Sequence, residues 1–401
     1  INETCCAYNL VKLSKDLNCY NPDNAQYLDY IERTLYNQII GSLNPDQYQT
    51  CYQYAVGLNA TKPFGNETPQ STCCGGTGSE NHTKYQQSAY FANDNTLWVG
   101  LYMPTTLHWK EKGVTIKQDC LWPAQHSAIK ITKGEGDFTL KLRVPYWATQ
   151  GFSIKVNGKE VAKSYQPSTY VELEQKHWKV GDVVEIDMPF SKHIEYGADK
   201  LSSDVASLDG TPLKTSWVGT LMYGPLVMAG TGAQTWNQAT LNIDSRLSNI
   251  TVGESNGVTT GAGANLLTLK LDGKEFQPDY YRNANSTHYY RINLTDAKSK
   301  KSKKMKIDFT ELNSLLNLAA ERKADQEKWN ALSQKVPEYA PWAPFGYERM
   351  LKVMAQAHEL VAKDKKKVTQ DELEGTTAIL NRAINTMRPG NLAEMEDLRE
   401  L

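Results

Sequence analysis

The chain changes its hydrophobic period twice along its length, and this constrains the fold more than any other feature. Apolar residues in the first 93 positions follow helical spacing, as Leu28, Ile31, Leu35 and Ile39 do. From about residue 94 the period shortens to two, which is typical of half-buried strands. From about residue 308 a helical pattern returns. This order predicts a multidomain α plus β protein.

Four domains are expected in the 401 residues. The first is helical. The second resembles an antiparallel β-sandwich, because short strands recur at close spacing and Asn157-Gly158 is a strong hairpin signal. A second β module and a C-terminal helical bundle follow. The predicted boundaries are 1–93, 94–190, 191–307 and 308–401.

The composition excludes two classes of partner. Lys and Arg number 44 against 45 Asp and Glu, a net charge of −1, whereas nucleic-acid and membrane-surface binders carry a basic excess. The longest nearly apolar stretch runs from Leu221 to Ala229, too short to cross a bilayer. The sequence therefore predicts neither a nucleic-acid partner nor a membrane span.

Two short segments concentrate groups that bind metal ions. Glu3-Thr4-Cys5-Cys6 and Cys73-Cys74-Gly75-Gly76-Thr77-Gly78 together offer one carboxylate and at least three thiols, and zinc takes four ligands of these types. We expect the second cysteine pair on a loop before a helix that begins near Gly78, with the glycines permitting the backbone to turn. The residue types leave an alternative open with equal weight, namely two buried cysteine pairs or disulfides to partners outside the chain.

The ligand types favour a catalytic zinc site over a structural one. All-Cys and Cys/His sets dominate structural sites. Zinc keeps a bound cysteine deprotonated at neutral pH, so that the thiolate can act as a nucleophile.

Four segments within roughly the first 190 residues occur in an order and spacing that a known family shares. They are a Glu-x-Cys helix start, a second helix, a Cys-Cys segment with the helix after it, and the early strands of a sandwich: Glu3 to Leu10, Glu32 to Asn37, Cys73 to Tyr85 and Trp109 to Val114. In these segments the chain resembles the β-L-arabinofuranosidase family, glycoside hydrolase family 127, and its relative family 146.

The resemblance implies a fold, a metal and a mechanism. The fold would be the end of an (α/α)6 barrel followed by antiparallel β-sandwich modules. Zinc would be held by Glu3, Cys5, Cys73 and Cys74, and Cys73 would also be the nucleophile. Attack of its thiolate on the anomeric carbon would give a thioglycosyl-enzyme, which water would hydrolyse with retention of configuration, unlike the usual two-carboxylate route.

The resemblance also implies residues around this centre. A substrate-contacting tyrosine of the family corresponds to Tyr54, although Tyr48 and Tyr52 leave the register open, and a tyrosine packed within the loop has equal weight. His82 is a candidate for a hydrogen bond near the zinc. A histidine at the surface, or one hydrogen-bonded away from the metal, is the more frequent case. Cys6 matches no ligand position and is expected in the core. The acid/base Glu of the family is expected upstream of Ile1, together with most barrel helices, so the chain resembles the C-terminal portion of a longer enzyme.

The function that the resemblance implies is a retaining glycoside hydrolase that releases L-arabinofuranose from plant-type glycans. An exported, periplasmic or extracellular protein is expected, because the glycan substrate lies outside the cell. One alternative is a non-catalytic carbohydrate-binding or scaffold protein whose cysteines are structural. The other is a hydrolase of the same superfamily that acts on another sugar, since family resemblance does not fix specificity.

Overall fold

The computed structural model describes residues 2–387 apart from 45–48, 55–56, 65–71, 162–164, 202–215, 237, 244–246, 260–264, 282–286, 297–306, 334–339, 343, 369 and 386. It divides into two compact units. One comprises Ile1–Ile243 and Asn249–Thr295, and the other comprises Asp244–Ser248 and Asp296–Leu401.

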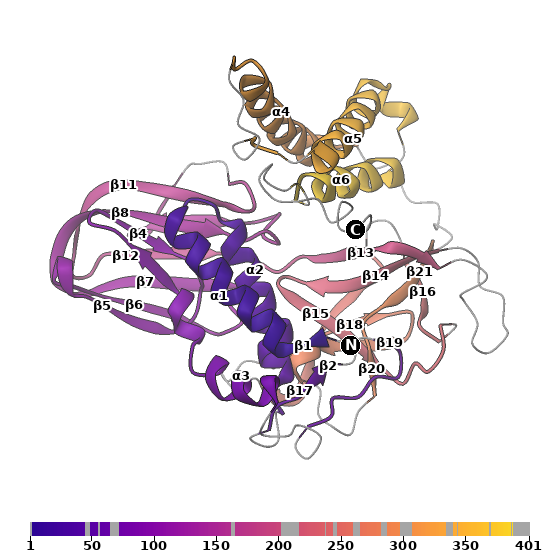
Figure 1. Ribbon diagram of the computed structural model, residues 1–401, viewed down its shortest axis with the longest axis horizontal. Coiled ribbons are helices and arrows are strands. Elements are labelled where there is room, and N and C mark those ends of the chain that lie inside the picture. The colour runs from indigo at the N-terminus through magenta and orange to yellow at the C-terminus, as the bar shows by residue number, and fades with distance from the viewer. Residues whose placement is uncertain are drawn as a thin grey trace. The chain divides into compact units, whose positions relative to one another are not determined.

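Two packed helices begin the first unit (Figure 1). They are α1 (Thr4–Tyr20) and α2 (Gln26–Thr34), and α2 continues through the π-helical turn η1 (Leu35–Ile39) into the 3-10 turn η2 (Ile40–Ser42). The helical spacing predicted for this segment is confirmed by its burial. The shared core comprises Tyr8, Leu28, Ile31, Leu35, Ile39, Ala89, Leu101 and Met103.

The third helix, α3 (Cys73–Asn81), begins at the cysteine pair and not near Gly78 as predicted. The side chain of Thr72 caps it by accepting a hydrogen bond from the Gly75 backbone N–H at 3.1 Å. Because glycine is a poor helix former, the glycine-rich sequence does not predict a helix at this position. The cysteine pair therefore occupies the first turn of a helix. The 3-10 turn η4 (Tyr85–Ser88) follows, and a short antiparallel pair joins β1 (Asn2–Glu3) to β2 (Gln53–Tyr54).

Two sheets face each other in the sandwich. The strand order is β10-β9-β12-β7-β6-β5 in the larger sheet and β11-β8-β4-β3 in the smaller. The expected antiparallel pairing is corrected at one place, because β4 and β8 run parallel. The chain passes through β5, β6 and β7 of the other sheet between them, and such a crossover permits parallel pairing. The strands are β3 (Tyr90–Ala92), β4 (Thr96–Val99), β5 (Thr105–Trp109), β6 (Val114–Cys120), β7 (His126–Lys133), β8 (Glu135–Val144), β9 (Ser153–Val156), β10 (Lys159–Glu160), β11 (Thr169–Lys179) and β12 (Val183–Asp187).

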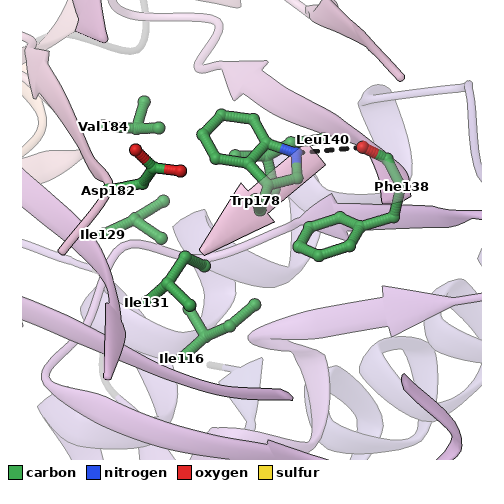
Figure 2. Close-up of a pocket in the computed structure, with 8 residues that line it drawn as sticks. All are labelled: Ile116, Ile129, Ile131, Phe138, Leu140, Trp178, Asp182 and Val184. Carbon is green, nitrogen blue, oxygen red and sulfur yellow. Dashed lines mark hydrogen bonds between the residues drawn. The ribbon is translucent and has the colours of Figure 1, made fainter. Parts of the chain in front are cut away.

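Side chains from both sheets fill the space between them (Figure 2). Ile116 and Ile129 come from the larger sheet, and Phe138 and Trp178 from the smaller, and all four are almost completely buried. The indole N–H of Trp178 donates to the Phe138 carbonyl at 2.9 Å. This satisfied polar group allows a large aromatic ring to lie in an apolar interior.

A buried ionic network joins α2 to the sandwich. Arg143 on β8 is fully buried and donates to Asp29 Oδ1 at 2.5 Å and to Glu32 Oε1 at 2.6 Å. Its Nε donates to the Gly100 carbonyl at 2.6 Å, and the indole N–H of Trp147 donates to Glu32 Oε2 at 2.8 Å. These bonds satisfy both carboxylates and fix the helix against the strand.

The rest of the first unit is a second β region. A central path of strands runs in the order β16-β21-β14-β15-β19-β18-β17, with β13 paired to β14 and β20 to β15. Asn37 of η1 ties it to the helices by donating to the Pro225 carbonyl at 2.8 Å and accepting from the Val227 N–H at 2.7 Å. The elements are β13 (Lys192–Leu201), β14 (Ser216–Tyr223), β15 (Leu226–Thr231), β16 (Thr240–Ile243), β17 (Thr251–Thr259), β18 (Asn265–Leu271), β19 (Lys274–Pro278), η6 (Asp279–Tyr281), β20 (His288–Tyr289) and β21 (Ile292–Asp296).

The second unit contains α4 (Thr310–Asn330), α5 (Pro344–Ala362) and α6 (Gln370–Asn385), with the 3-10 turn η8 (Lys365–Lys367) between the last two. The three helices share a core that includes Leu312, Met350, Ala357 and Leu380. The expected mixture of helices and several sheets is thus confirmed. The closed barrel, the bundle and the four domain boundaries stay predictions.

None of the described helices combines the length and the apolar character that a membrane span requires.

Candidate metal centre

Four predicted ligands come together in the first unit. One ligand atom each of Glu3, Cys5, Cys73 and Cys74 lies within 4.8 Å of the other three. Cys5 Sγ is 3.3 Å from Cys73 Sγ and 3.5 Å from Glu3 Oε2, and Cys73 Sγ is 3.9 Å from the same carboxylate oxygen. The structure therefore juxtaposes residues that are about 70 positions apart in the sequence.

Two helix N-termini converge on this cluster. Cys5 is the second residue of α1, and Cys73 and Cys74 are the first two residues of α3. The Cys5 backbone N–H donates to Cys74 Sγ at 3.4 Å. The partial positive charge at a helix N-terminus stabilises a thiolate there. The pairing of β1 with β2 holds Glu3 next to α1, opposite Gln53.

The thiols differ in exposure. Cys5 and Cys74 are buried, whereas Cys73 is exposed. Burial is the main cause that raises the pKa of Cys5, and contacts with Cys73, Cys74 and Glu3 raise it further. Burial also raises the pKa of Cys74, while the Cys5 backbone N–H acts in the opposite direction. The two buried thiols therefore stay protonated at neutral pH unless a cation lies among them.

The donor set fits zinc. A tetrahedral ion with metal–sulfur bonds of about 2.3 Å holds its sulfur ligands about 3.8 Å apart. The sulfur–sulfur distance of 3.3 Å between Cys5 and Cys73 and the sulfur–oxygen distances of 3.5 and 3.9 Å to Glu3 lie near that value. These residues could not form such a set if their cysteines were in disulfide bonds, and Cys5, Cys73 and Cys74 form no disulfide in the structure.

Tyr52 lies beside Glu3, whereas the predicted role of Tyr54 stays a prediction. The negative charge of Glu3 is the main cause that raises the pKa of the Tyr52 hydroxyl, and Cys73, Cys74 and a hydrogen bond with Glu3 add to it. Only the backbone of Tyr54 is described, paired with Asn2, and its side chain lies outside the described part. The spacing of three tyrosines in an irregular segment gives no signal for choosing between these two residues.

His82 lies at the opposite end of α3 from the cysteines. As the residue after Asn81 it is about 12 Å along the helix axis from Cys74, at a rise of about 1.5 Å per residue. Its Nδ1 is hydrogen-bonded with the Tyr85 hydroxyl at 2.6 Å, and burial lowers its pKa. The metal-ligand set does not include it. Its predicted role near the zinc stays a prediction.

Cys6 is exposed, so the expectation of a core position is wrong. α1 begins at Thr4, and Cys5 and Tyr8 take its buried face. Cys6 falls on the opposite face with Leu10 and Leu13, which are 49% and 52% exposed.

Thr72→Ala should weaken zinc binding about fivefold. Loss of an N-cap costs about 1 kcal/mol, and the glycines of α3 give it little helical stability of its own. Competition with a chromogenic chelator measures the affinity. Thr83→Ala is the matched control, because Thr83 Oγ1 donates to the Glu80 carbonyl at the far end of α3. Equal zinc affinity in Thr72→Ala and wild type would contradict the role of this cap.

Comparison with known families and structures is consistent with this geometry. Residues 1–87, which include all four residues of the cluster, match the family described as "Beta-L-arabinofuranosidase, GH127 catalytic domain". Residues 96–190 match "Beta-L-arabinofuranosidase, GH127 middle domain". No curated protein matches the chain.

Solved structures with the same fold include one described as a glycoside hydrolase, with 19% identity and a TM-score of 0.57. Others are a GH127 β-arabinofuranosidase, with 20% identity and a TM-score of 0.55, and the GH127 β-L-arabinofuranosidase of Geobacillus stearothermophilus T6, with 18% identity and a TM-score of 0.56. Each match covers 73% of this chain and, in that order, 52%, 49% and 50% of the other, so the chain spans about half the length of these structures.

Two adjacent segments of the chain thus match the two successive GH127 domains, and the first holds the cluster of one carboxylate and three thiols. Within residues 1–190, the chain therefore carries sequence of the GH127 β-L-arabinofuranosidase family.

Proposed function

We propose that the protein is a zinc- and cysteine-dependent retaining glycoside hydrolase that releases L-arabinofuranose from plant-type glycans. The observation that carries the proposal is the convergence of Glu3, Cys5, Cys73 and Cys74 within a match to the GH127 catalytic domain. Zinc bound by these four residues would hold the thiols as thiolates at neutral pH.

Cys73 is the nucleophile in this proposal. Its exposure supports the assignment, since Cys5 and Cys74 are buried and a nucleophile must reach the sugar. The Cys73 thiolate attacks the anomeric carbon, and the bond to the leaving oxygen breaks as a carboxylic acid protonates that oxygen. The same carboxylate then takes a proton from water, which displaces the sulfur. Two inversions give net retention.

The acid/base residue is proposed to lie outside residues 1–401. Glu3 is itself a ligand candidate, and Glu80, on the helix that carries Cys73 and Cys74, accepts a hydrogen bond from the Tyr8 hydroxyl. Neither is therefore free to shuttle a proton at the anomeric oxygen. Tyr54 stays the residue proposed to contact the sugar, and Tyr52, beside Glu3, is a second candidate.

Further helices of an (α/α)6 barrel are proposed to pack against α1. Leu10, Leu13, Leu17 and Tyr20 are spaced as one helical face and are 49%, 52%, 39% and 89% exposed. An apolar stripe of this kind is typical of a surface that another element covers. The match covers about half of each solved structure, so the other half of those structures offers room for such helices.

A panel of nitrophenyl glycosides tests the function in the whole enzyme. Release of nitrophenol from the β-L-arabinofuranoside, lost in Cys73→Ala, is expected. Release only from a hexoside or from the α-L-arabinofuranoside would indicate a same-superfamily enzyme for another sugar. No hydrolysis of any glycoside, with glycan binding intact in Cys73→Ala, would indicate a non-catalytic binding protein.

The enzyme is also proposed to be exported, because plant-type glycans lie outside the cell. Cell fractionation with an antibody against the chain tests this proposal, and recovery in the cytoplasmic fraction alone would contradict it.

A further inference from the structure

The two halves of the metal centre come from different helices, so something must fix the distance between them. Cys5 lies on α1, and Cys73 and Cys74 lie on α3. Away from the thiols, a side-chain hydrogen bond joins the two helices: the Tyr8 hydroxyl donates to Glu80 Oε1 at 2.9 Å. Tyr8 follows Cys5 by about one helical turn, and Glu80 follows Cys73 by about two.

We propose that the hydrogen bond between Tyr8 and Glu80 positions α1 and α3 so that their N-terminal turns present the three thiols to one metal ion. This inference rests on the proposed zinc site. It assigns Tyr8 and Glu80 as positioning residues that contact neither metal nor substrate.

Tyr8 is rigidly held. Its side chain is 3% exposed and packs in the core with Leu28, Ile31 and Leu35. The ammonium group of Lys12 lies 4.8 Å from the centre of its ring. Burial, with the adjacent Glu80, raises the pKa of Tyr8 to about 12, so its hydroxyl keeps its proton near neutral pH and remains a donor.

α3, in contrast, depends on its contacts. It has nine residues, of which Gly75, Gly76 and Gly78 are poor helix formers. Its N-terminus is held by the Thr72 cap. Its middle packs closely on Thr50, because a Cβ at Gly78 would lie 2.9 Å from Thr50 Oγ1. Glu80 lies in the last turn of α3. Its carboxylate is exposed, and the hydrogen bond from the Tyr8 hydroxyl connects this turn to the buried face of α1.

Tyr8→Phe and Glu80→Ala should each weaken zinc binding about tenfold, the lower end of the effect of residues that orient metal ligands from outside. Glu80→Gln keeps an acceptor oxygen and should restore the affinity to within about threefold of wild type. The double variant Tyr8→Phe/Glu80→Ala should lose little more than either single variant, since both remove the same bond. Competition with a chromogenic chelator measures zinc affinity, and Co²⁺ absorption reports the ligand geometry.

Tyr102→Phe is the matched control. Tyr102 is also 3% exposed, and its hydroxyl donates to the Arg143 carbonyl at 2.6 Å, within the sandwich. If Tyr8 had a merely structural role, Tyr8→Phe and Tyr102→Phe would both lower the melting temperature of the metal-free protein, and both would keep the zinc affinity of the wild type. That result would overturn the proposal. Additive effects in the double variant, or no restoration by Glu80→Gln, would overturn it as well. Failure of the wild-type protein to bind zinc would instead refute the metal centre itself, so the two failures are distinguishable.

Discussion

Replacing Cys73 with serine is expected to lower the hydrolysis rate of the whole enzyme by at least about 10⁴-fold, since loss of a nucleophile removes most of the rate enhancement that catalytic residues provide as a unit. A serine hydroxyl stays protonated at neutral pH even beside a metal ligand set, whereas a metal-held thiol is deprotonated. The steady-state rate on the β-L-arabinofuranoside, with zinc supplied in excess, measures the effect.

Cys6→Ser is the matched control for this loss. Cys6 is exposed and is the neighbour of Cys5, yet it lies outside the ligand cluster. We expect the rate of Cys6→Ser to remain within about twofold of wild type, as is usual for surface substitutions. A thiol-reactive arabinofuranose analogue should label Cys73 alone. Wild-type activity in Cys73→Ser would remove the cysteine nucleophile from the mechanism.

The second large effect concerns stability. Arg143→Met is expected to lower the free energy of unfolding by about 3 to 5 kcal/mol, because it leaves two buried carboxylates without their counter-ion. Arg143 is fully buried, and Asp29 and Glu32 receive its guanidinium bonds. Urea denaturation measures the loss. Lys117→Met is the control, since the pair of Lys117 with Asp119 is exposed and should contribute less than about 1 kcal/mol.

The cause of this loss can be separated from the loss of packing. Adding Asp29→Asn and Glu32→Gln to Arg143→Met removes the uncompensated charges and should recover part of the stability. Burial raises the pKa of Asp29 to about 6. The folded state therefore binds this proton more tightly than the unfolded state, and the contribution of Asp29 to stability falls as the pH rises from about 4 to 6. Arg143→Met should strengthen that dependence. Equal losses at pH 5 and pH 7 would contradict uncompensated charge as the cause.

The cluster of Glu3, Cys5, Cys73 and Cys74 could be predicted from the sequence because each of its two halves is a short, continuous motif. Glu3 and Cys5 lie next to each other at one helix start, and Cys73 and Cys74 at another, so two short motifs carry the whole set. The change of period at residue 94 is equally local, and the sandwich follows from it.

Other features depend on contacts that the sequence pattern does not contain. The start of α3 at Cys73 depends on a cap at Thr72 and overrides the low helix propensity of glycine. The place of Tyr52 beside Glu3 likewise follows from the fold and not from the spacing of the tyrosines. The bonds of Arg143 with Asp29 and Glu32 span more than 100 residues, and neither hydrophobic period nor spacing indicates them.

The metal content of the purified chain tests the central claim most directly. The protein would be prepared under reducing conditions, equilibrated with zinc and freed of excess metal. Elemental mass spectrometry would then measure its zinc content per chain. The account predicts about one zinc per wild-type chain, the number that one tetrahedral set of four ligands holds, and none in the Cys73→Ser/Cys74→Ser variant. A folded wild-type protein without zinc, or a double variant that keeps it, would contradict the site formed by Glu3, Cys5, Cys73 and Cys74.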